Sequence, residues 1–263
     1  MGMQVRKVAL KDVGASYCCM SETPPGVSWA EYLPESRKWF RENLGKHVEG
    51  YHILDDGKVV GHIYYASSEN ALVPFETEPK VAFIYCTEML RNYMRKGYGK
   101  MMFDYMKNNL KKQGFKGILV DATDFQEYMH HSHFAKQGFK VIKEHKPFKL
   151  MYFPLSKEKL KVKLIELNYK PSKGRVEVTL FKSFFCPVSI CMYHLVKTVA
   201  QSFGNKVKLV EIEPSLEIVR KYGVSSDSLI NGKPKLLGPV SEEDVRKAIQ
   251  EEITQLSTSI ETS

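Results

Sequence analysis

Met94-Arg95-Lys96-Gly97-Tyr98-Gly99-Lys100 is the segment from which the rest of the chain can be interpreted. It follows an apolar run at 81–86 and precedes a segment, 101–110, whose apolar residues recur at helical spacing. This order predicts a strand, a glycine turn and a helix. Two glycines let a ligand approach the backbone closely, and the start of the helix adds the positive end of its dipole. With three basic side chains nearby, we expect the segment to bind a pyrophosphate.

Two common nucleotide-binding motifs do not fit this loop. The dinucleotide fingerprint needs a third glycine three residues after the second, and that position holds Met102. A P-loop needs Gly-Lys-Ser/Thr, whereas Lys100 is followed by Met101. An ordinary glycine turn flanked by solvated lysines stays open as the alternative.

The loop resembles motif A of the GNAT N-acetyltransferases, Gln/Arg-x-x-Gly-x-Gly/Ala. Tyr93 lies where that family usually has an aromatic residue, and Ala-Lys-Gln-Gly-Phe at 135–139 is similar to a later family signature. Met94 departs from the usual Gln or Arg. The resemblance implies that acetyl-CoA is the cosubstrate, with its pyrophosphate on main-chain amides, so we expect the departure to weaken this site rather than abolish it.

The resemblance also implies that the pantetheine arm pairs with the backbone where the central strand splays from its neighbour. The residues expected at the acetyl-CoA site are Thr87, Glu88, Met89, Met94, Arg95, Lys96, Gly97, Tyr98, Gly99 and Lys100.

Composition indicates a folded protein of one or two domains. The chain has 263 residues, of which 43% are hydrophobic and 11% aromatic, enough for a substantial core. Its formal net charge of +9 would permit nucleic-acid binding. The lysines, however, are spread through mixed-sign segments, so we expect no nucleic-acid partner.

Neither a signal sequence nor a membrane span is indicated. The first 14 residues lack an apolar signal core, and the most apolar window, 184–200, is interrupted by Pro187, His194 and Lys197. Five cysteines at no repeated spacing argue against a secreted disulfide framework. We therefore expect a cytoplasmic protein with reduced thiols and no membrane partner.

Residues 1–156 are expected to form an α/β domain with a mixed, largely antiparallel sheet and flanking helices, in the element order of the GNAT fold. A first strand is expected at 3–10, a helix or its lead-in at 13–20, and an interrupted helix at 29–44. The remaining expected elements are a hairpin at 48–54 and 59–66, a loop at 67–79, the central strand at 81–89, a helix at 101–112, a strand at 117–120, a short helix at 127–136, and strands at 139–142 and 150–155.

A lysine-rich linker at 157–175, with one short strand at 160–167, leads to a second domain at 176–256. Its expected elements are strands at 176–181 and 207–212, helices from Cys186-Pro187 to 203 and at 215–222, a hairpin at 228–230 and 235–237, and a final helix at 241–255. This order, with Cys-Pro at a helix start and Asn-Gly-Lys in the hairpin, resembles a thioredoxin or glutaredoxin fold. The tail at 257–263 is expected to be loose. The two-domain arrangement resembles the YoaP-like branch of the GNAT family.

Catalytic residues are harder to assign than the cofactor loop. The place of the family's usual proton-donating tyrosine holds Phe134, which cannot donate a proton. Our catalytic candidates are His131 as acid or base and Tyr85 as a polar contact, while a solvated histidine cluster stays open. His130 and His133 lie three apart on the expected helix, but no third ligand is visible, so we expect no metal.

The cysteines offer two further candidates. One of Cys18 and Cys19 is expected in the core, with a role in acceptor or soft-metal binding left open. Cys186, at a helix N-terminus, is the candidate reactive thiol because that position lowers a thiol pKa. A Cys-x-x-Cys pair is excluded because residue 189 is Ser189, and the fold's usual cis-proline position holds Ser226.

The sequence therefore predicts an acetyl-CoA-dependent N-acetyltransferase acting on a small-molecule or peptide amine. The appended domain is expected to serve substrate binding, dimerisation or redox sensing. The alternative is a thiol-dependent redox or binding protein whose GNAT domain binds acyl-CoA without catalysis. The acceptor, the acid and base, and the oligomeric state, a homodimer included, stay open.

Overall fold

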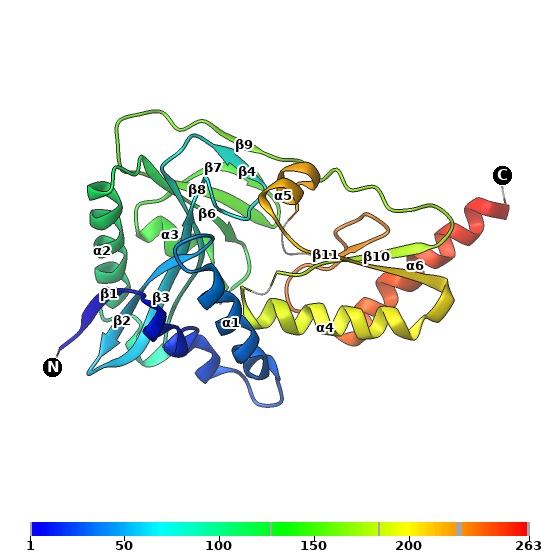
Figure 1. The fold of residues 1–263 in the computed structure, drawn as a ribbon, viewed down its shortest axis with the longest axis horizontal. Helices are drawn as coiled ribbons and strands as arrows, with labels where there is room; N and C mark the ends of the chain where they lie inside the picture. Colours follow the sequence, from blue (N-terminus) through cyan, green and yellow to red (C-terminus); the bar gives the residue numbers. More distant parts are fainter. Residues whose placement is uncertain (1, 127, 184, 225–227, 262–263) are drawn as a thin grey trace. The chain divides into compact units, whose positions relative to one another are not determined.

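The computed structural model describes residues 2–126, 128–183, 185–224 and 228–261. The chain divides into two compact units (Figure 1). The first comprises Met1–Gly26, Phe40–Ala71 and Glu76–Lys163, and the second comprises Val27–Trp39, Leu72–Phe75 and Leu164–Ser263. Two short early segments thus belong to the second unit, which spacing along the sequence did not indicate.

A seven-stranded sheet forms the centre of the first unit, counted over the described residues. In spatial order its strands are β1 (Gln4–Lys7), β2 (Glu49–Asp55), β3 (Lys58–Ser67), β5 (Val81–Met89), β6 (Gly117–Thr123), β8 (Phe148–Pro154) and β7 (Lys140–His145). Only the β5–β6 pair is parallel, and the other neighbours are antiparallel. The expected mixed, largely antiparallel sheet is confirmed.

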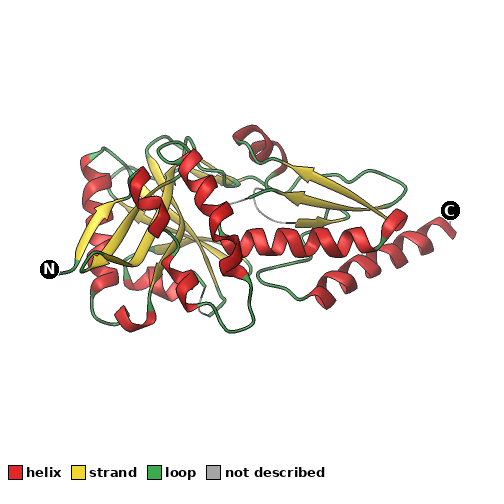
Figure 2. Ribbon diagram, turned by 60° about the horizontal axis from the view of Figure 1, so that its bottom comes forward, coloured by secondary structure: helices red, strands yellow, loops and turns green. Residues whose placement is uncertain are grey.

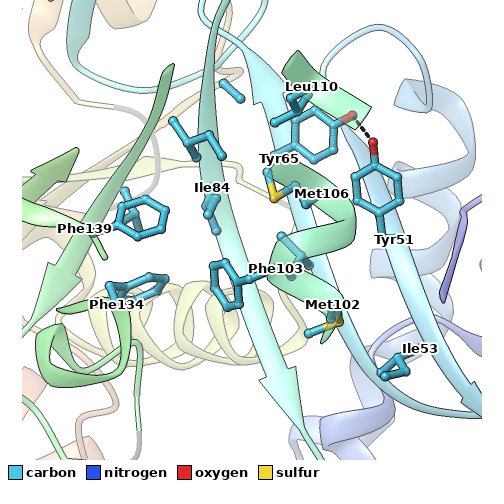
Figure 3. Close-up of a cluster of buried hydrophobic side chains, with 14 of the residues drawn as sticks. Tyr51, Ile53, Tyr65, Ile84, Met102, Phe103, Met106, Leu110, Phe134 and Phe139 are labelled. Carbon is cyan, nitrogen blue, oxygen red and sulfur yellow. Dashed lines mark hydrogen bonds between the residues drawn. The ribbon is translucent and has the colours of Figure 1, made fainter. Parts of the chain in front are cut away.

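Helix α2 (Tyr98–Lys112) covers one face of this sheet. Its buried residues Met102, Phe103, Met106 and Leu110 recur at intervals of one, three and four, which gives one apolar stripe. Figure 3 shows these side chains pointing toward the strands, with the hydroxyls of Tyr51 and Tyr65 hydrogen-bonded beside them. Burial of this stripe fixes the helix, and with it the loop at its N-terminus, against β5.

Short helix α3 (His131–Lys136) adds Phe134 to the same core, where its ring lies 6.1 Å from that of Phe103. The expected helix at 127–136 begins later than predicted because Met129 has a left-handed φ of 47° and His130 caps the first turn. Residue 127 lies outside the described residues.

The opposite face of the sheet meets the N-terminal segment of the chain. Here the helix expected at 13–20 is replaced by the 3₁₀ turns η1 (Leu10–Ala15) and η2 (Cys18–Glu22). The helix expected at 29–44 comprises the 3₁₀ turn η3 (Trp29–Tyr32) and α1 (Leu33–Asn43), of which residues up to Trp39 belong to the second unit. Tyr17, in a left-handed conformation, directs the chain from η1 into η2, and its ring packs edge-on against Phe40 and Tyr64.

Two short strands, near residues 75 and 163, form a small sheet that was not expected from the sequence. The segment predicted as a loop contains β4 (Phe75–Thr77), which pairs with β9 (Val162–Leu164). The linker strand expected at 160–167 is therefore shorter than predicted. Glu78 accepts a hydrogen bond from the backbone N–H of Lys161 at 2.9 Å, which helps to hold the two segments together.

The second unit has a three-stranded sheet with the order β11 (Val207–Ile212), β10 (Val176–Phe181) and β12 (Ser228–Ile230), counted over the described residues. Strands β10 and β11 are parallel, and β12 is antiparallel to β10. The unit also contains helices α4 (Pro187–Ser202), α5 (Leu216–Tyr222) and α6 (Glu242–Glu261), and the 3₁₀ turn η5 (Gly204–Lys206). Figure 2 shows α4 and α6 side by side along the strands.

Two predictions for this unit are wrong. No strand forms at 235–237; Lys233 makes only a single bridge to Ile230. Helix α6 continues to Glu261, beyond the predicted end at 255, so described residues 257–261 are helical rather than loose. No glycine or proline interrupts this segment, and the Ser257 and Thr258 hydroxyls donate to carbonyls one turn earlier.

Over the described residues, no helix combines the length and the apolar character that crossing a membrane would require.

Candidate active site

The loop between β5 and α2 begins with the 3₁₀ turn η4 (Arg91–Tyr93) and ends at Gly97, the N-cap of α2. Gly97 has a φ of 83°, a left-handed conformation that favours glycine. The first helical backbone bond runs from the N–H of Met101 to the carbonyl of Gly97 at 3.0 Å. The N–H groups of residues 98–100 therefore belong to the helix terminus, where an anion is the favoured partner.

The space beside this turn is open. A Cβ atom added to Gly97 or to Gly99 would meet no other part of the protein within 4 Å. For Gly99, therefore, neither backbone conformation nor crowding accounts for the absence of a side chain. This open space lies where the sequence predicts the pyrophosphate.

Aromatic and basic side chains surround the cradle. The Tyr93 hydroxyl donates to Asp55 at 3.1 Å, and the Lys96 ammonium lies 5.8 Å from the centre of the Tyr93 ring. Lys100 pairs with Asp104 one turn along α2. Met94 and Arg95 are exposed, and Arg95 has a φ of 59°. Cationic side chains at an exposed helix N-terminus raise the local potential for a phosphate ligand.

The central strand leaves its parallel neighbour at the place where the pantetheine arm is expected. Strand β5 pairs with β6 only as far as Ile84, opposite Val120, but stays paired with β3 up to Met89. The β3 ladder passes from Ile84 directly to Cys86, so Tyr85 is the extra residue of a β-bulge. Residues 87–89 therefore lie along a split between two strands, with its closed end near Tyr85 and Cys86.

Glu88, expected only as a backbone contact, also places a carboxylate at this split. Burial, together with the charge of Glu22, raises the pKa of Glu88, while a hydrogen bond from the N–H of Met89 lowers it. That N–H lies 2.9 Å from the carboxylate. Glu22 in turn accepts the N–H of Arg91 at 2.9 Å. A raised pKa makes the carboxylate a stronger base, which suits general-base catalysis.

A buried group of polar side chains that sequence reasoning missed lies on the sheet face away from α2. His62 on β3 is fully buried, and its two ring nitrogens contact two thiols: Nδ1 lies 3.4 Å from Cys18 Sγ, and Nε2 lies 3.5 Å from Cys86 Sγ. Its ring stacks on Tyr64 at 4.2 Å. Burial lowers the pKa of His62 to about 3, so the imidazole is neutral.

A second histidine extends this group. His52 Nε2 lies 3.1 Å from the Tyr64 hydroxyl, which accepts the N–H of Tyr17 at 3.0 Å. Burial lowers the pKa of His52 to about 4. The signal for both histidines was available, since each stands at an inward position of a strand that is otherwise apolar.

The two catalytic candidates lie in different surroundings. Tyr85 is half-buried at the bulge, with its ring 6.1 Å from that of Phe83. His131 begins α3, and its Nε2 lies 3.5 Å from the Asp124 carboxylate, which also pairs with Lys149. Phe134 is fully buried in the core and supplies no polar atom to either.

The other histidines of this segment have local roles. His130 Nδ1 accepts the N–H of Ser132 as the cap of α3, and His133 packs against the Phe103 ring. Among the residues that the structure describes, no three His, Cys, Asp or Glu side chains are arranged to hold a metal ion.

Cys186 does not have the environment predicted for it. It is the N-cap of α4 and is half-buried, and burial raises the pKa of its thiol, although the N–H groups of Val188 and Ser189 lower it. The expected lowered pKa is therefore wrong, because loss of solvent outweighs the helix terminus. Cys191 faces a different neighbour, with its sulfur 3.9 Å from the Ser28 hydroxyl. Ser226, at the cis-proline position, lies outside the described residues.

Comparison with known proteins agrees with this geometry in the first unit. Residues 17–139 match the model of the acetyltransferase (GNAT) family. A search of curated proteins found no match.

Three solved structures are similar to part of the chain. An N-acetyltransferase from Thermoplasma acidophilum in complex with coenzyme A is 16% identical, with a TM-score of 0.42 over 59% of this chain and 99% of its own. The ribosomal-protein-S18-alanine N-acetyltransferase from Escherichia coli is 14% identical, with a TM-score of 0.43 over 60% and 96%. A GNAT family N-acetyltransferase from Escherichia coli in complex with CoA is 12% identical, with a TM-score of 0.44 over 59% and 83%.

The family match agrees with the sheet order and the glycine loop of the first unit. Residues 17–139 are therefore similar to the acetyltransferase (GNAT) family.

Proposed function

We propose that this protein transfers an acetyl group from acetyl-CoA to the amine of a small molecule or peptide. The observation that carries the proposal is the open glycine cradle at the start of α2, next to the split between β5 and β6. In this arrangement the loop 94–100 holds the pyrophosphate, and residues 87–89 hold the pantetheine arm. The thioester then lies toward the closed end of the split, near Tyr85.

Glu88 is our candidate for the general base. Its carboxylate lies on the same strand segment as the pantetheine arm, and burial raises its pKa. Removing a proton from the attacking amine requires a base whose pKa is not far below the working pH. Tyr85 stays a prediction as a polar contact, and His131 stays a prediction as an acid or base. Asp124 would orient the His131 ring.

For the second unit we propose a thioredoxin-like domain, in agreement with a YoaP-like arrangement and the boundaries 1–156, 157–175 and 176–256. The parallel β10–β11 pair, the antiparallel β12 and the Cys-Pro start of α4 support it. Because burial raises the pKa of Cys186, we favour substrate binding or dimerisation over thiol chemistry. We also propose a cytoplasmic location, without nucleic acid or membrane as a partner.

The test is CoA release from acetyl-CoA, measured by chromatography over a panel of amines: a polyamine, free amino acids, an aminoglycoside and peptides with a free N-terminus. We expect release with at least one class and a large loss in Glu88→Gln. Lys111→Gln, an exposed substitution at the far end of α2, serves as the matched control. If the protein binds CoA but none of the amines in the panel leads to CoA release, the proposed catalysis is contradicted.

The alternative function, thiol-dependent reduction with a non-catalytic acyl-CoA module, makes a different prediction. A glutathione-linked disulfide reduction assay compares the wild type with Cys186→Ser. Because burial raises the pKa of the half-buried Cys186 thiol, we expect no reduction above background by either protein. Reduction that depends on Cys186 would favour the alternative.

A further inference from the structure

The proposed transferase lacks the tyrosine that would return a proton to the departing CoA sulfur, since Phe134 is buried and apolar. We propose that Cys86 is the proton donor to the CoA thiolate, and that His62 and Cys18 form a relay that resupplies it. This inference rests on the proposed function and assigns a further catalytic residue to it.

The position of Cys86 is the first argument. Strand β5 leaves β6 after Ile84, so an extended arm that enters from the loop at 94–100 along residues 89–87 reaches the closed end of the split at Tyr85 and Cys86. Cys86 is half-buried, on the same sheet face as Tyr64, its partner on β3. A thiol at this end of the split is placed beside the sulfur of the thioester.

The second argument is chemical. Cys86 and CoA are both alkyl thiols, so a proton passes from one sulfur to the other without a change in the kind of acid. Such matching favours transfer as the carbon–sulfur bond breaks. A serine hydroxyl at the same place would be a far weaker acid.

The third argument is the arrangement around His62. Each of the two neutral tautomers satisfies both contacts. In the one that the relay starts from, Nε2–H donates to Cys86 Sγ at 3.5 Å and Nδ1 accepts the S–H of Cys18 at 3.4 Å. Because the ring is fully buried, it stays neutral and passes a proton by exchanging tautomers rather than by becoming charged. Tyr64, stacked on the ring, holds its orientation.

The relay closes on Glu88. Strand pairing sets Glu88 directly opposite His62. Burial of the Cys18 thiol raises its pKa most, and the charge of Glu88 raises it further. The proton balance is then complete. The neutral amine attacks the carbonyl carbon, a nitrogen–carbon bond forms, the carbon–sulfur bond breaks, and the nitrogen loses its proton to Glu88. Cys86 protonates the CoA thiolate and regains its proton from His62, which takes one from Cys18, which takes one from Glu88.

The experiment measures enzyme-dependent CoA release from acetyl-CoA with hydroxylamine, a small nucleophile that needs no dedicated acceptor pocket. We expect Cys86→Ser to lower kcat by about 10²-fold, within the range of general acid catalysis, although serine matches cysteine in size. Cys18→Ala interrupts the same relay, so the double variant should lose no more than Cys86→Ser alone. Cys19→Ser, beside Cys18 but outside the relay, should keep wild-type kcat.

Melting temperature and CoA affinity, measured for each variant, show that fold and binding are retained. If wild type releases CoA and Cys86→Ser keeps its kcat, or if the losses of the single variants simply multiply, the relay is wrong while the transferase assignment stands. If wild type binds CoA but releases none with hydroxylamine or the amine panel, the transferase assignment fails, and the relay fails with it.

Discussion

At the scale of single residues, the candidate site depends on polar groups held where burial is costly. Glu88 and His62 lie opposite each other on neighbouring strands, and burial shifts both toward their neutral forms. A sheet selected for stability alone would place apolar side chains at such positions. Retaining a carboxyl and an imidazole beside the split is the pattern expected of a catalytic site.

For Glu88→Gln we predict opposite effects on activity and stability. The raised pKa means that the folded protein binds a proton more tightly than the unfolded chain, so the free energy of unfolding falls as the pH rises through that window. At neutral pH the folded protein must keep a buried carboxylate ionised, and glutamine removes this free-energy cost. The glutamine side chain can still accept the N–H of Met89. We expect a higher melting temperature at pH 7, little difference at low pH, and a kcat about 10²-fold lower. Thermal melts at several pH values measure the stability, and the CoA-release assay measures kcat. A lower melting temperature at pH 7 with an unchanged kcat would contradict the role of Glu88 as the general base.

At the scale of elements, α2 joins the core to the cofactor loop. Its apolar stripe packs against β2, β3 and β5, while its N-terminus carries the turn with Gly97 and Gly99. The same periodicity that made the helix predictable therefore fixes the direction of its first N–H groups.

For Gly99→Leu we predict little loss of stability together with a loss of CoA affinity. The added Cβ meets no protein atom, and leucine favours a helix over glycine by up to about 1 kcal/mol, so the melting temperature should stay the same or rise. The family motif allows alanine at this position, but a leucine side chain would occupy the space assigned to the pyrophosphate, so we expect CoA to bind at least about tenfold more weakly, a change of about 1.4 kcal/mol. Thermal melts and calorimetric titration measure the two quantities.

Asn108→Ala, at an exposed position of the same helix, is the matched control for this change. It should raise helix stability without altering CoA affinity. If Gly99→Leu and Asn108→Ala bind CoA equally well, the cradle is not the pyrophosphate site.

At the scale of the whole molecule, prediction from sequence succeeded where one local pattern determines the outcome. The central strand at 81–89 and the strand at 176–181 have the predicted ends. An apolar run at 81–86 marks the first, and alternation of apolar with polar residues marks the second. The relay could not be predicted, since Cys18, His62 and Cys86 are far apart in sequence and meet only through strand register and the turn at Tyr17. The raised pKa of Cys186 depends on burial, which its position at a helix start does not reveal.

The Asn-Gly-Lys turn of the second unit has a structural role that its hairpin signature did not indicate. Asn231 and Lys233 donate to Glu252 of α6, a side chain that is only 1% exposed. Burial alone would raise the pKa of Glu252, but hydrogen bonds from Lys233, Lys235 and Asn231 outweigh it and lower the pKa to about 2. The carboxylate therefore ties the turn to the last helix.

For Glu252→Gln we expect the free energy of unfolding of this unit to fall by about 1–3 kcal/mol at neutral pH. Because the folded pKa is lowered, the contribution is complete above the ordinary carboxyl pKa and is lost as the pH falls toward 2, so the difference should shrink in acid. Urea denaturation at pH 7 and pH 3 measures it. Glu251→Gln, at an exposed ion pair, should change stability by no more than about 1 kcal/mol and is the control.

The central claim is that a backbone cradle at the start of α2 binds the pyrophosphate of acetyl-CoA, and calorimetric titration with CoA tests it most directly. The account predicts saturable binding by the wild type that is lost in Gly97→Glu. The added Cβ would meet no protein atom within 4 Å and the carboxylate would repel the phosphates, while the left-handed backbone at this position adds local strain to the turn. Absence of binding by the wild type, or equal binding by a folded Gly97→Glu variant, would contradict it.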